Sequence, residues 1–310
     1  KFLEVMNREE QPLILTYAAG IMGGTGFAVF FGCGLMDALV AALVSLMIVF
    51  VGNWLGKRES NLLIYNLILA FLAEVVIIGM DFLGIGTHQD RIMIGIVMLL
   101  ISALSTTNGI REMLQRDFIS GLINIMNSIL GAAGIAFGIA IAMRLLGGGD
   151  SDGYVLNHNV GIQLISCTVA CVGFALWFKI KGKQVIYSGI GAFFTWAIYL
   201  VVYEVWPSNF GATMAGAIFV AAYAFIMSRV NKAPATIFLT ASAFPLIPGP
   251  NLYYMMYGWV SADSAMAGRE MDLLLETCLA IALGFLIVDV VSRIVLYAKK
   301  MEYRVGKKTV

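Results

Sequence analysis

The chain has 310 residues, of which 60% are hydrophobic and 13% are charged, and its formal net charge is +1. Soluble proteins carry about 25% charged residues, and a chain so close to neutral argues against binding to nucleic acid. The composition therefore predicts a polytopic membrane protein surrounded by the lipid bilayer.

Apolar runs that approach or exceed the ~17–25 residues needed to cross a bilayer follow one another along the chain. We expect ten spans, and the fourth and ninth of these are short. The expected spans are Pro12–Gly32, Met36–Leu55, Leu62–Ile85, Ile92–Ser105, Ile119–Leu146, Val160–Phe178, Gln184–Trp206, Gly211–Val230, Thr236–Ile247 and Leu273–Tyr297. A Gly-rich acidic linker, residues 147–159, separates the fifth span from the sixth.

Cationic residues predict the orientation of these spans. With the N-terminus inside, 17 of the 20 Lys and Arg residues fall in cytoplasmic segments, as the positive-inside rule requires. Both termini are then cytoplasmic. Residues 1–150 and 151–310 would each hold five spans. Because five is an odd number, two halves that share one fold must be inserted in opposite directions. The expected fold is an all-α membrane protein of two inverted five-helix repeats with broken helices.

The first expected break is the stretch STTNGIREMLQRDFISG, residues 105–121. The span before it gives about 21 Å of helix, short of the roughly 30 Å hydrocarbon core. The polar residues 105–108 should cap a new helix that begins near Gly109. An N-terminus of this kind inside the membrane suits a carboxylate. The alternative is a plain loop at the membrane surface.

The second expected break is the stretch PLIPGPNLYYMMYGWVSAD, residues 245–263. Pro245 and Pro248 lack backbone donors, Gly249 permits an unusual turn, and Pro250 fits the first turn of the next helix. A surface loop is again the alternative. Paired interruptions in the two halves of a chain are typical of the binding site of a secondary transporter.

Glu74 lies in the middle of the third span, between apolar residues. An ionisable group at this depth is costly, and it is a candidate for a functional site. Asn66 and Asp81 fall about two turns away on the same helical face, so we expect this stripe to face a polar cavity and to serve proton coupling. The alternative is a structural, hydrogen-bonded glutamate.

Other ionisable residues are weaker candidates for proton coupling. We expect Asp117 and Asp263 to end the two short helices, where each could line a cavity or be solvated at an interface. Glu276 is a further candidate, early in the tenth span. Asp289 and Arg293 are four residues apart, and we expect them to pair with each other.

The remaining polar and small residues have simpler interpretations. Arg111 and Arg116 could contact an anionic substrate or anchor the chain on the cytoplasmic side. Glycine pairs such as Gly134 and Gly138 predict close helix packing. The pattern predicts no cofactor, no metal site and no disulfide framework, because the cysteines lie inside apolar runs. These are Cys33, Cys167, Cys171 and Cys278.

The two breaks resemble motifs of the bacterial threonine/serine exporter family. The first-half motif of that family is similar to P-G-x-x-x-T-N-A-I-R-D-L…G-D, and this chain has SALSTTNGIREMLQRD. The second-half motif is similar to P-L-V-P-G-x-x-L-Y, and this chain has FPLIPGPNLYYMMYGWVSAD. The stretch Phe174–Val201 also resembles the second half. Ser102 and Ala103 replace the usual first Pro-Gly, so we expect a softer first break.

The resemblance implies export of threonine or serine, driven by the proton gradient. Two-subunit members of the family are linked to dicarboxylate export, which leaves the substrate open. We expect Thr106, Thr107, Asn108, Gly249, Pro250 and Asn251 to line the substrate site. The motif matches add Arg111, Pro248 and Tyr253 to this set. For the proton site we expect Glu74 first and Asp117 second.

Two other functions fit the same sequence. A passive channel would use the same breaks without concentrating its substrate. An intramembrane aspartyl protease could use Asp37 and Asp81, but Leu35 follows Gly32-Cys33-Gly34 where such enzymes have an aspartate. Glycine-rich helices also permit a homo-oligomer without requiring one.

Overall fold

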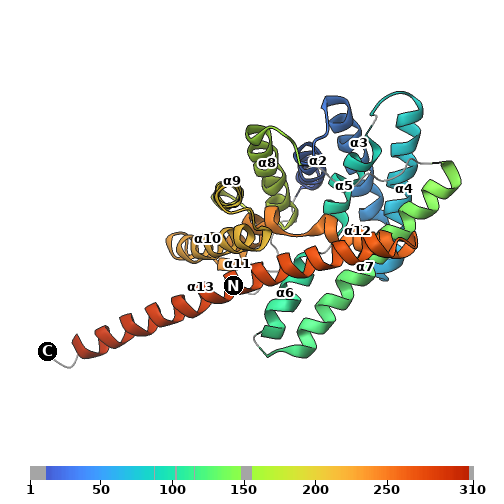
Figure 1. Ribbon diagram of the computed structural model, residues 1–310. Coiled ribbons are helices and arrows are strands. Elements are labelled where there is room, and N and C mark those ends of the chain that lie inside the picture. The colour runs from blue at the N-terminus through green and yellow to red at the C-terminus, as the bar shows by residue number, and fades with distance from the viewer. Residues whose placement is uncertain (1–11, 87, 102, 115, 148–155, 307–310) are drawn as a thin grey trace.

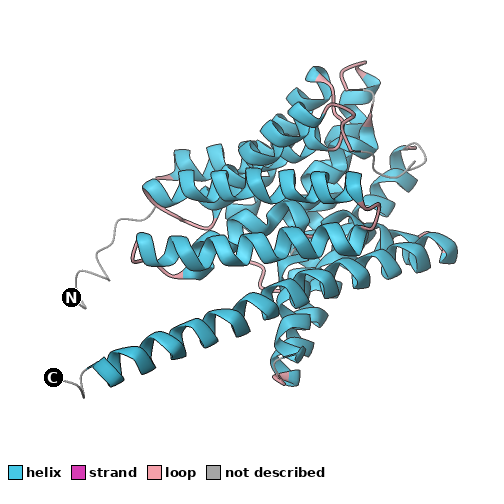
Figure 2. Ribbon diagram, turned by 60° about the vertical axis from the view of Figure 1, so that its left-hand side comes forward, coloured by secondary structure: helices cyan, strands magenta, loops and turns pink. Residues whose placement is uncertain are grey.

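The structure is a computed structural model that describes residues 12–86, 88–101, 103–114, 116–147 and 156–306. All regular structure in these residues is helical (Figure 2). Eight of the helices are long and apolar enough to cross a membrane. The prediction of an all-α polytopic membrane protein is confirmed.

The two halves contain the same succession of helices: three long, two short and one long. The first half comprises α2 (Leu13–Phe30), α3 (Leu35–Leu55), α4 (Leu62–Phe82), α5 (Gln89–Leu100), α6 (Ala103–Leu114) and α7 (Phe118–Leu146). The second half comprises α8 (Val160–Trp177), α9 (Lys183–Val205), α10 (Asn209–Val230), α11 (Ala235–Ala243), the 3₁₀ turn η1 (Phe244–Leu246), α12 (Gly249–Val260) and α13 (Ser264–Gly306). The expected spans match these helices to within a few residues, except at the end of α5 and at both ends of α13.

The first break lies earlier than the sequence predicts. Helix α5 ends at Leu100 and α6 begins at Ala103, so the expected start near Gly109 is wrong. Gly109 instead lies inside α6, where a Cβ atom would be 2.7 Å from the carbonyl oxygen of Gly121 in α7. Gly109 therefore allows α6 and α7 to pack closely. The break itself, between α5 and α6, has no Pro-Gly pair in its sequence.

The second break begins with η1 and ends where α12 starts at Gly249. Pro250 occupies the first turn of α12, as predicted. Gly249, however, does not adopt the left-handed backbone of an unusual turn. A Cβ atom there would instead collide with the Met98 side chain and lie 3.3 Å from Ile101. The second break therefore contacts the end of α5, which is one side of the first break.

The short helices α6 and α12 join the two halves. Each packs on the last helix of its own half, α7 or α13, and also on the last helix of the other half. Figure 1 shows α12 beside α7, and the C-terminal part of α13 extending beyond the bundle. Within each half, the third helix packs on the last, α4 on α7 and α10 on α13. Gly134 and Gly138 bring α7 against the backbone of α4, which confirms the prediction of close packing.

A second contact between the halves is the pairing of α2 with α8. A Cβ atom on Gly173 would lie 2.6 Å from the backbone nitrogen of Gly23, and one on Gly26 would lie 2.8 Å from that of Ala170. Lipid tails are as apolar as leucine, so helices in a bilayer associate through close van der Waals packing at small residues. These glycines therefore set the distance between α2 and α8.

Substitution of Gly173 by alanine tests this contact. The added methyl group meets backbone rather than a side chain that can move, so we expect the free energy of unfolding to fall by about 1–3 kcal/mol. Gly79→Ala is the matched control, because a Cβ atom there has no neighbour within 4 Å. That change should be neutral or stabilising by up to about 1 kcal/mol. Thermal unfolding in one detergent compares the two variants, and equal stabilities would contradict the assignment.

Candidate functional site

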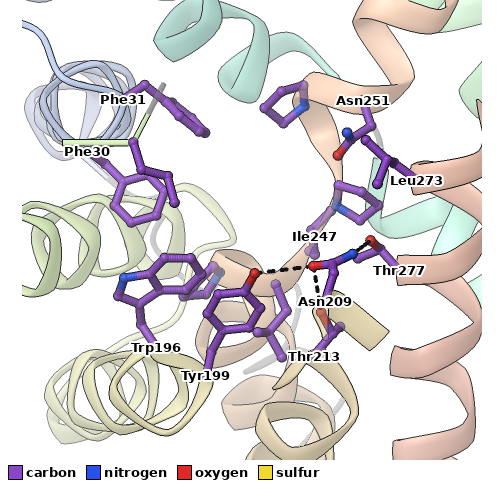
Figure 3. Close-up of a pocket in the computed structure, with 15 residues that line it drawn as sticks. Phe30, Phe31, Trp196, Tyr199, Asn209, Thr213, Ile247, Asn251, Leu273 and Thr277 are labelled. Atoms are coloured by element: carbon purple, nitrogen blue, oxygen red, sulfur yellow. Dashed lines mark hydrogen bonds between the residues drawn. The ribbon is translucent and has the colours of Figure 1, made fainter. Parts of the chain in front are cut away.

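A cavity of about 140 Å³ lies where the second break meets the end of α2 (Figure 3). The break supplies Pro248, Pro250 and Asn251 to its lining, which are three of the residues predicted from the sequence. Helices α2, α9, α10 and α13 supply the other walls. An engineered cavity of about 150 Å³ in a protein core holds one benzene molecule, so the volume suits a ligand of similar size.

One wall of the cavity is aromatic. The rings of Trp196 and Tyr199 stack with their centroids 4.6 Å apart, and Phe30 meets Trp196 edge to face at 4.9 Å. The Trp196 indole nitrogen donates to Gln163 Oε1 at 3.1 Å, which fixes the ring. Phe31 completes this side (Figure 3). Aromatic faces of this kind attract a cation such as an ammonium group.

The opposite wall is polar and centres on Asn209, the first residue of α10. Its Oδ1 accepts a hydrogen bond from the Tyr199 hydroxyl at 3.2 Å and lies 3.5 Å from the Thr213 hydroxyl. Its Nδ2 donates to the Thr277 hydroxyl of α13 at 3.0 Å. Three helices thus bring their polar side chains to one point on the cavity wall (Figure 3).

Asn251, on another part of the cavity wall, is hydrogen-bonded to a buried carboxylate. Asn251 Nδ2 donates to Glu270 Oε2 at 2.9 Å, and Glu270 is only 5% exposed. The other carboxylate oxygen of Glu270 pairs with the Arg269 guanidinium at 3.2 Å, and most of the Arg269 side chain is exposed. The α12 break is therefore tied to α13 through a charge-assisted hydrogen bond.

The described lining of the cavity is uncharged. The fifteen residues that the structure describes there include neither a cationic nor an anionic side chain. A doubly charged ligand would bind there without counter-charges from the described lining residues, which is costly. The lining therefore favours a neutral or zwitterionic ligand.

Glu74 lies outside this cavity and is completely buried in α4. Neither of its carboxylate oxygens has a hydrogen-bond partner among the described residues. The Tyr253 hydroxyl of α12 is close enough to Glu74 for an electrostatic interaction. A buried carboxyl without a partner is costly to ionise and therefore suits a group that binds and releases a proton.

The predicted polar stripe on α4 faces neighbouring helices rather than one polar cavity. Asn66 Nδ2 donates to the Gly131 carbonyl of α7 at 3.2 Å. Asp81 accepts a hydrogen bond from Gln89 of α5 at 2.7 Å. Of the three residues in the stripe, Glu74 alone has no hydrogen-bond partner among the described residues.

Asn108 is the one predicted substrate-site residue of the first motif whose side chain the structure describes, and it does not line the cavity. It is half-buried on α6. The side chains of Thr106, Thr107 and Arg111 lie outside the described residues. Arg116 is exposed, with a positive φ of 72° between α6 and α7.

The predicted acidic residues of the loops cap helices. Asp117 and Asp263 are exposed and accept backbone hydrogen bonds at the first turns of α7 and α13, so they begin long helices rather than end short ones. Glu276 is half-buried on α13. Asp289 and Arg293 pair at 2.9 Å, as predicted.

The sequence analysis does not identify five polar residues of the candidate site: Tyr199, Asn209, Thr213, Glu270 and Thr277. Glu270 was assigned to a loop because the apolar run begins at Leu273, whereas α13 begins nine residues earlier at Ser264. Aspartate is a favoured helix-capping residue, so Asp263 indicates that α13 starts at Ser264. Asn209 follows Trp206, Pro207 and Ser208 and precedes the expected eighth span, so the sequence places it in a loop. Its contact with Thr277 spans 68 residues of sequence.

Two family models match the chain, one over each half. The model described as "Putative threonine/serine exporter" matches residues 1–146, and the model described as "Threonine/Serine exporter, ThrE" matches residues 163–291. A curated relative from Corynebacterium glutamicum, described as "Threonine/serine exporter", is 21% identical over 306 residues. The alignment covers 92% of this chain and 61% of that relative, so the chain spans about three fifths of the relative's length. No solved structure matches the chain.

Substitution of Glu270 tests the link between the break and α13. Glu270→Ala leaves the buried Asn251 amide without its acceptor, so we expect the free energy of unfolding to fall by about 1–3 kcal/mol. Glu270→Gln keeps an acceptor oxygen and should cost less. Glu276→Ala, on the same helix, is the control. Thermal unfolding in detergent distinguishes them, and the link is refuted if Glu270→Ala and Glu276→Ala are equally stable.

Proposed function

Because the chain belongs to the threonine/serine exporter family, a family of transporters and not of enzymes, we propose that it exports threonine and serine across the plasma membrane. The proposed driving force is the proton gradient, so that the amino acid is exported in exchange for protons. The observation that carries the proposal is the uncharged cavity at the second helix break.

The cavity supports an amino acid over a dicarboxylate. A zwitterion carries one ammonium group and one carboxylate. The aromatic wall of Phe30 and Trp196 suits the ammonium group, and the positive dipole end of α12, which meets the cavity at Asn251, suits the carboxylate. A dicarboxylate would bring two negative charges, and the lining provides no cationic side chain for either.

Glu74 is the proposed proton-binding residue. It is fully buried without a hydrogen-bond partner in the described chain, whereas the loop carboxylates Asp117 and Asp263 cap helices. A passive facilitator does not require a buried carboxyl group that binds and releases a proton. The buried Glu74 therefore favours a coupled carrier over a channel.

Helix α12 provides a physical connection between the proton site and the cavity. Tyr253 approaches Glu74, and Asn251 lines the cavity. Residues two apart on a helix point in nearly opposite directions. In the proposed mechanism, a change in the protonation of Glu74 alters the packing of α12 and thereby the cavity on its other side.

The proposed transport cycle is alternating access between two inverted repeats, residues 1–150 and 151–310. The matching order of helices in the halves and the reciprocal packing of α6 and α12 support this proposal. Residues 244–250, which form the second break, are buried, as freed backbone must be at membrane depth.

Transport by purified protein in proteoliposomes tests the function. With an imposed pH gradient, we expect labelled threonine and serine to accumulate and succinate not to. Glu74→Gln cannot exchange a proton, so accumulation should fall to the level without a gradient, while exchange of labelled for unlabelled threonine continues. Glu204→Gln, an exposed carboxylate on α9, is the control and should behave as wild type.

The possible outcomes separate the alternatives. Accumulation of succinate alone would identify a dicarboxylate exporter. Equilibration of threonine without accumulation would identify a facilitator. Full gradient-driven accumulation by Glu74→Gln would rule out Glu74 as the proton site.

Labelling with a membrane-impermeant maleimide tests the inverted arrangement. Ser60 and Ser261 are exposed in loops of different halves, and the ten-span arrangement places Ser60 inside and Ser261 outside. In intact cells we expect Ser261→Cys to label and Ser60→Cys to label only after lysis. The four native cysteines are buried, and burial also raises the pKa of the Cys33 thiol in the turn after α2, so background labelling should be low. Labelling of both variants from one side contradicts the arrangement.

A further inference from the structure

The polar wall of the cavity differs from the usual environment of hydroxyl groups in membrane helices. Threonine hydroxyls in a helix commonly donate to the carbonyl four residues earlier. Thr168, Thr195 and Thr240 do so here, each at 2.7 Å. Thr277 instead turns toward Asn209, and within the described residues its hydroxyl accepts a hydrogen bond from that amide and donates none.

The hydrogen bonds around Asn209 have a definite direction. The Tyr199 hydroxyl donates to the Asn209 amide oxygen, and the amide nitrogen donates to the Thr277 oxygen. A hydroxyl group has one proton to donate and two lone pairs, and this bond uses one lone pair of Thr277. The Thr277 proton is therefore available at a side chain that is only 7% exposed and lines the cavity.

An unused donor in a buried position is unfavourable unless a ligand or water satisfies it. The neighbouring hydroxyl of Thr213 lies on the same wall. Paired hydroxyls can both donate and accept, as the hydroxyl group of a ligand does. The ammonium and carboxylate groups of a zwitterion have other partners, the aromatic wall and the α12 break, so the group left for this wall is the side-chain hydroxyl.

We propose that Thr277, held by Asn209 and Tyr199, binds the β-hydroxyl of the substrate and so selects threonine and serine over valine and alanine. This inference rests on the proposed function. A site built to bond a substrate hydroxyl rejects the analogue that lacks it, because its own buried polar groups are then left unpaired. Asn209 and Tyr199 are positioning residues that act through Thr277.

The experiment uses a matched pair of substrates and a matched pair of side chains. Threonine and valine have nearly the same shape, and so do Thr277 and the substituted side chain in Thr277→Val. Inhibition of labelled-threonine exchange in proteoliposomes by unlabelled threonine and by valine gives the preference between them. We expect Thr277→Val to reduce the preference for threonine about tenfold, the loss of one hydrogen bond. Thr277→Ser keeps the hydroxyl and should retain the preference.

Two further variants make the test specific. Thr240→Val removes a hydroxyl outside the cavity and should leave the preference unchanged. Tyr199→Phe removes the hydroxyl at the far end of the hydrogen-bond chain. Tyr199→Phe should reduce the preference for threonine by a smaller factor than Thr277→Val. If Thr277→Val does not fold, Tyr199→Phe provides the test of the inference.

The outcomes separate this inference from the function on which it rests. A wild-type preference for threonine that is unchanged in folded Thr277→Val, or in Tyr199→Phe, overturns the inference alone. Wild-type protein that transports neither threonine nor serine overturns both. A tenfold loss in Thr277→Val with retention in Thr277→Ser supports the assignment.

Discussion

The close approach of α2 and α8 is the contact on which the arrangement of the two halves depends. In a bilayer the apolar side chains of two helices gain little by leaving lipid, so the contact relies on backbones that approach closely. Gly26 and Gly173 allow this approach. Because α2 is held against the second half, its final residues, Phe30 and Phe31, form part of the cavity. The same docking brings Met98 and Ile101, at the end of α5, against Gly249 in the second break.

Each short helix is attached to the long helix that follows it by a carboxylate and an amide. In the first half, Glu112 of α6 accepts hydrogen bonds from Ser120 and Asn124 of α7, at 2.9 and 2.8 Å. In the second half the order is reversed, with the amide of Asn251 on α12 and the carboxylate of Glu270 on α13. The charge in the second half is the more deeply buried of the two, and it lies behind the cavity wall. The two breaks are therefore similar in architecture and different in chemistry.

Much of the fold could be predicted because membrane spans are long and their apolar runs are explicit. The breaks were also visible, since Pro248, Pro250 and the shortness of the preceding runs are local features. The start of α6 was predicted wrongly because Gly109 looks like a helix boundary, while its actual role is contact with Gly121 of α7. Of the predicted residues of the second motif, Pro248, Pro250 and Asn251 are in the cavity lining, whereas Gly249 and Tyr253 are not. The polar partners in α9, α10 and α13 were not found.

The sequence by itself determined the class of the protein, the succession of long and short helices, and the burial of Glu74, because hydropathy and helix-breaking residues act over a few turns. Only the tertiary structure decided which polar groups meet. Asn209 and Thr277 are unremarkable in their own segments, and they form a site because α10 packs on α13. Tyr253 interacts electrostatically with Glu74 because α12 packs between the halves. Contacts of this range depend on helix docking, which no local pattern of residues encodes.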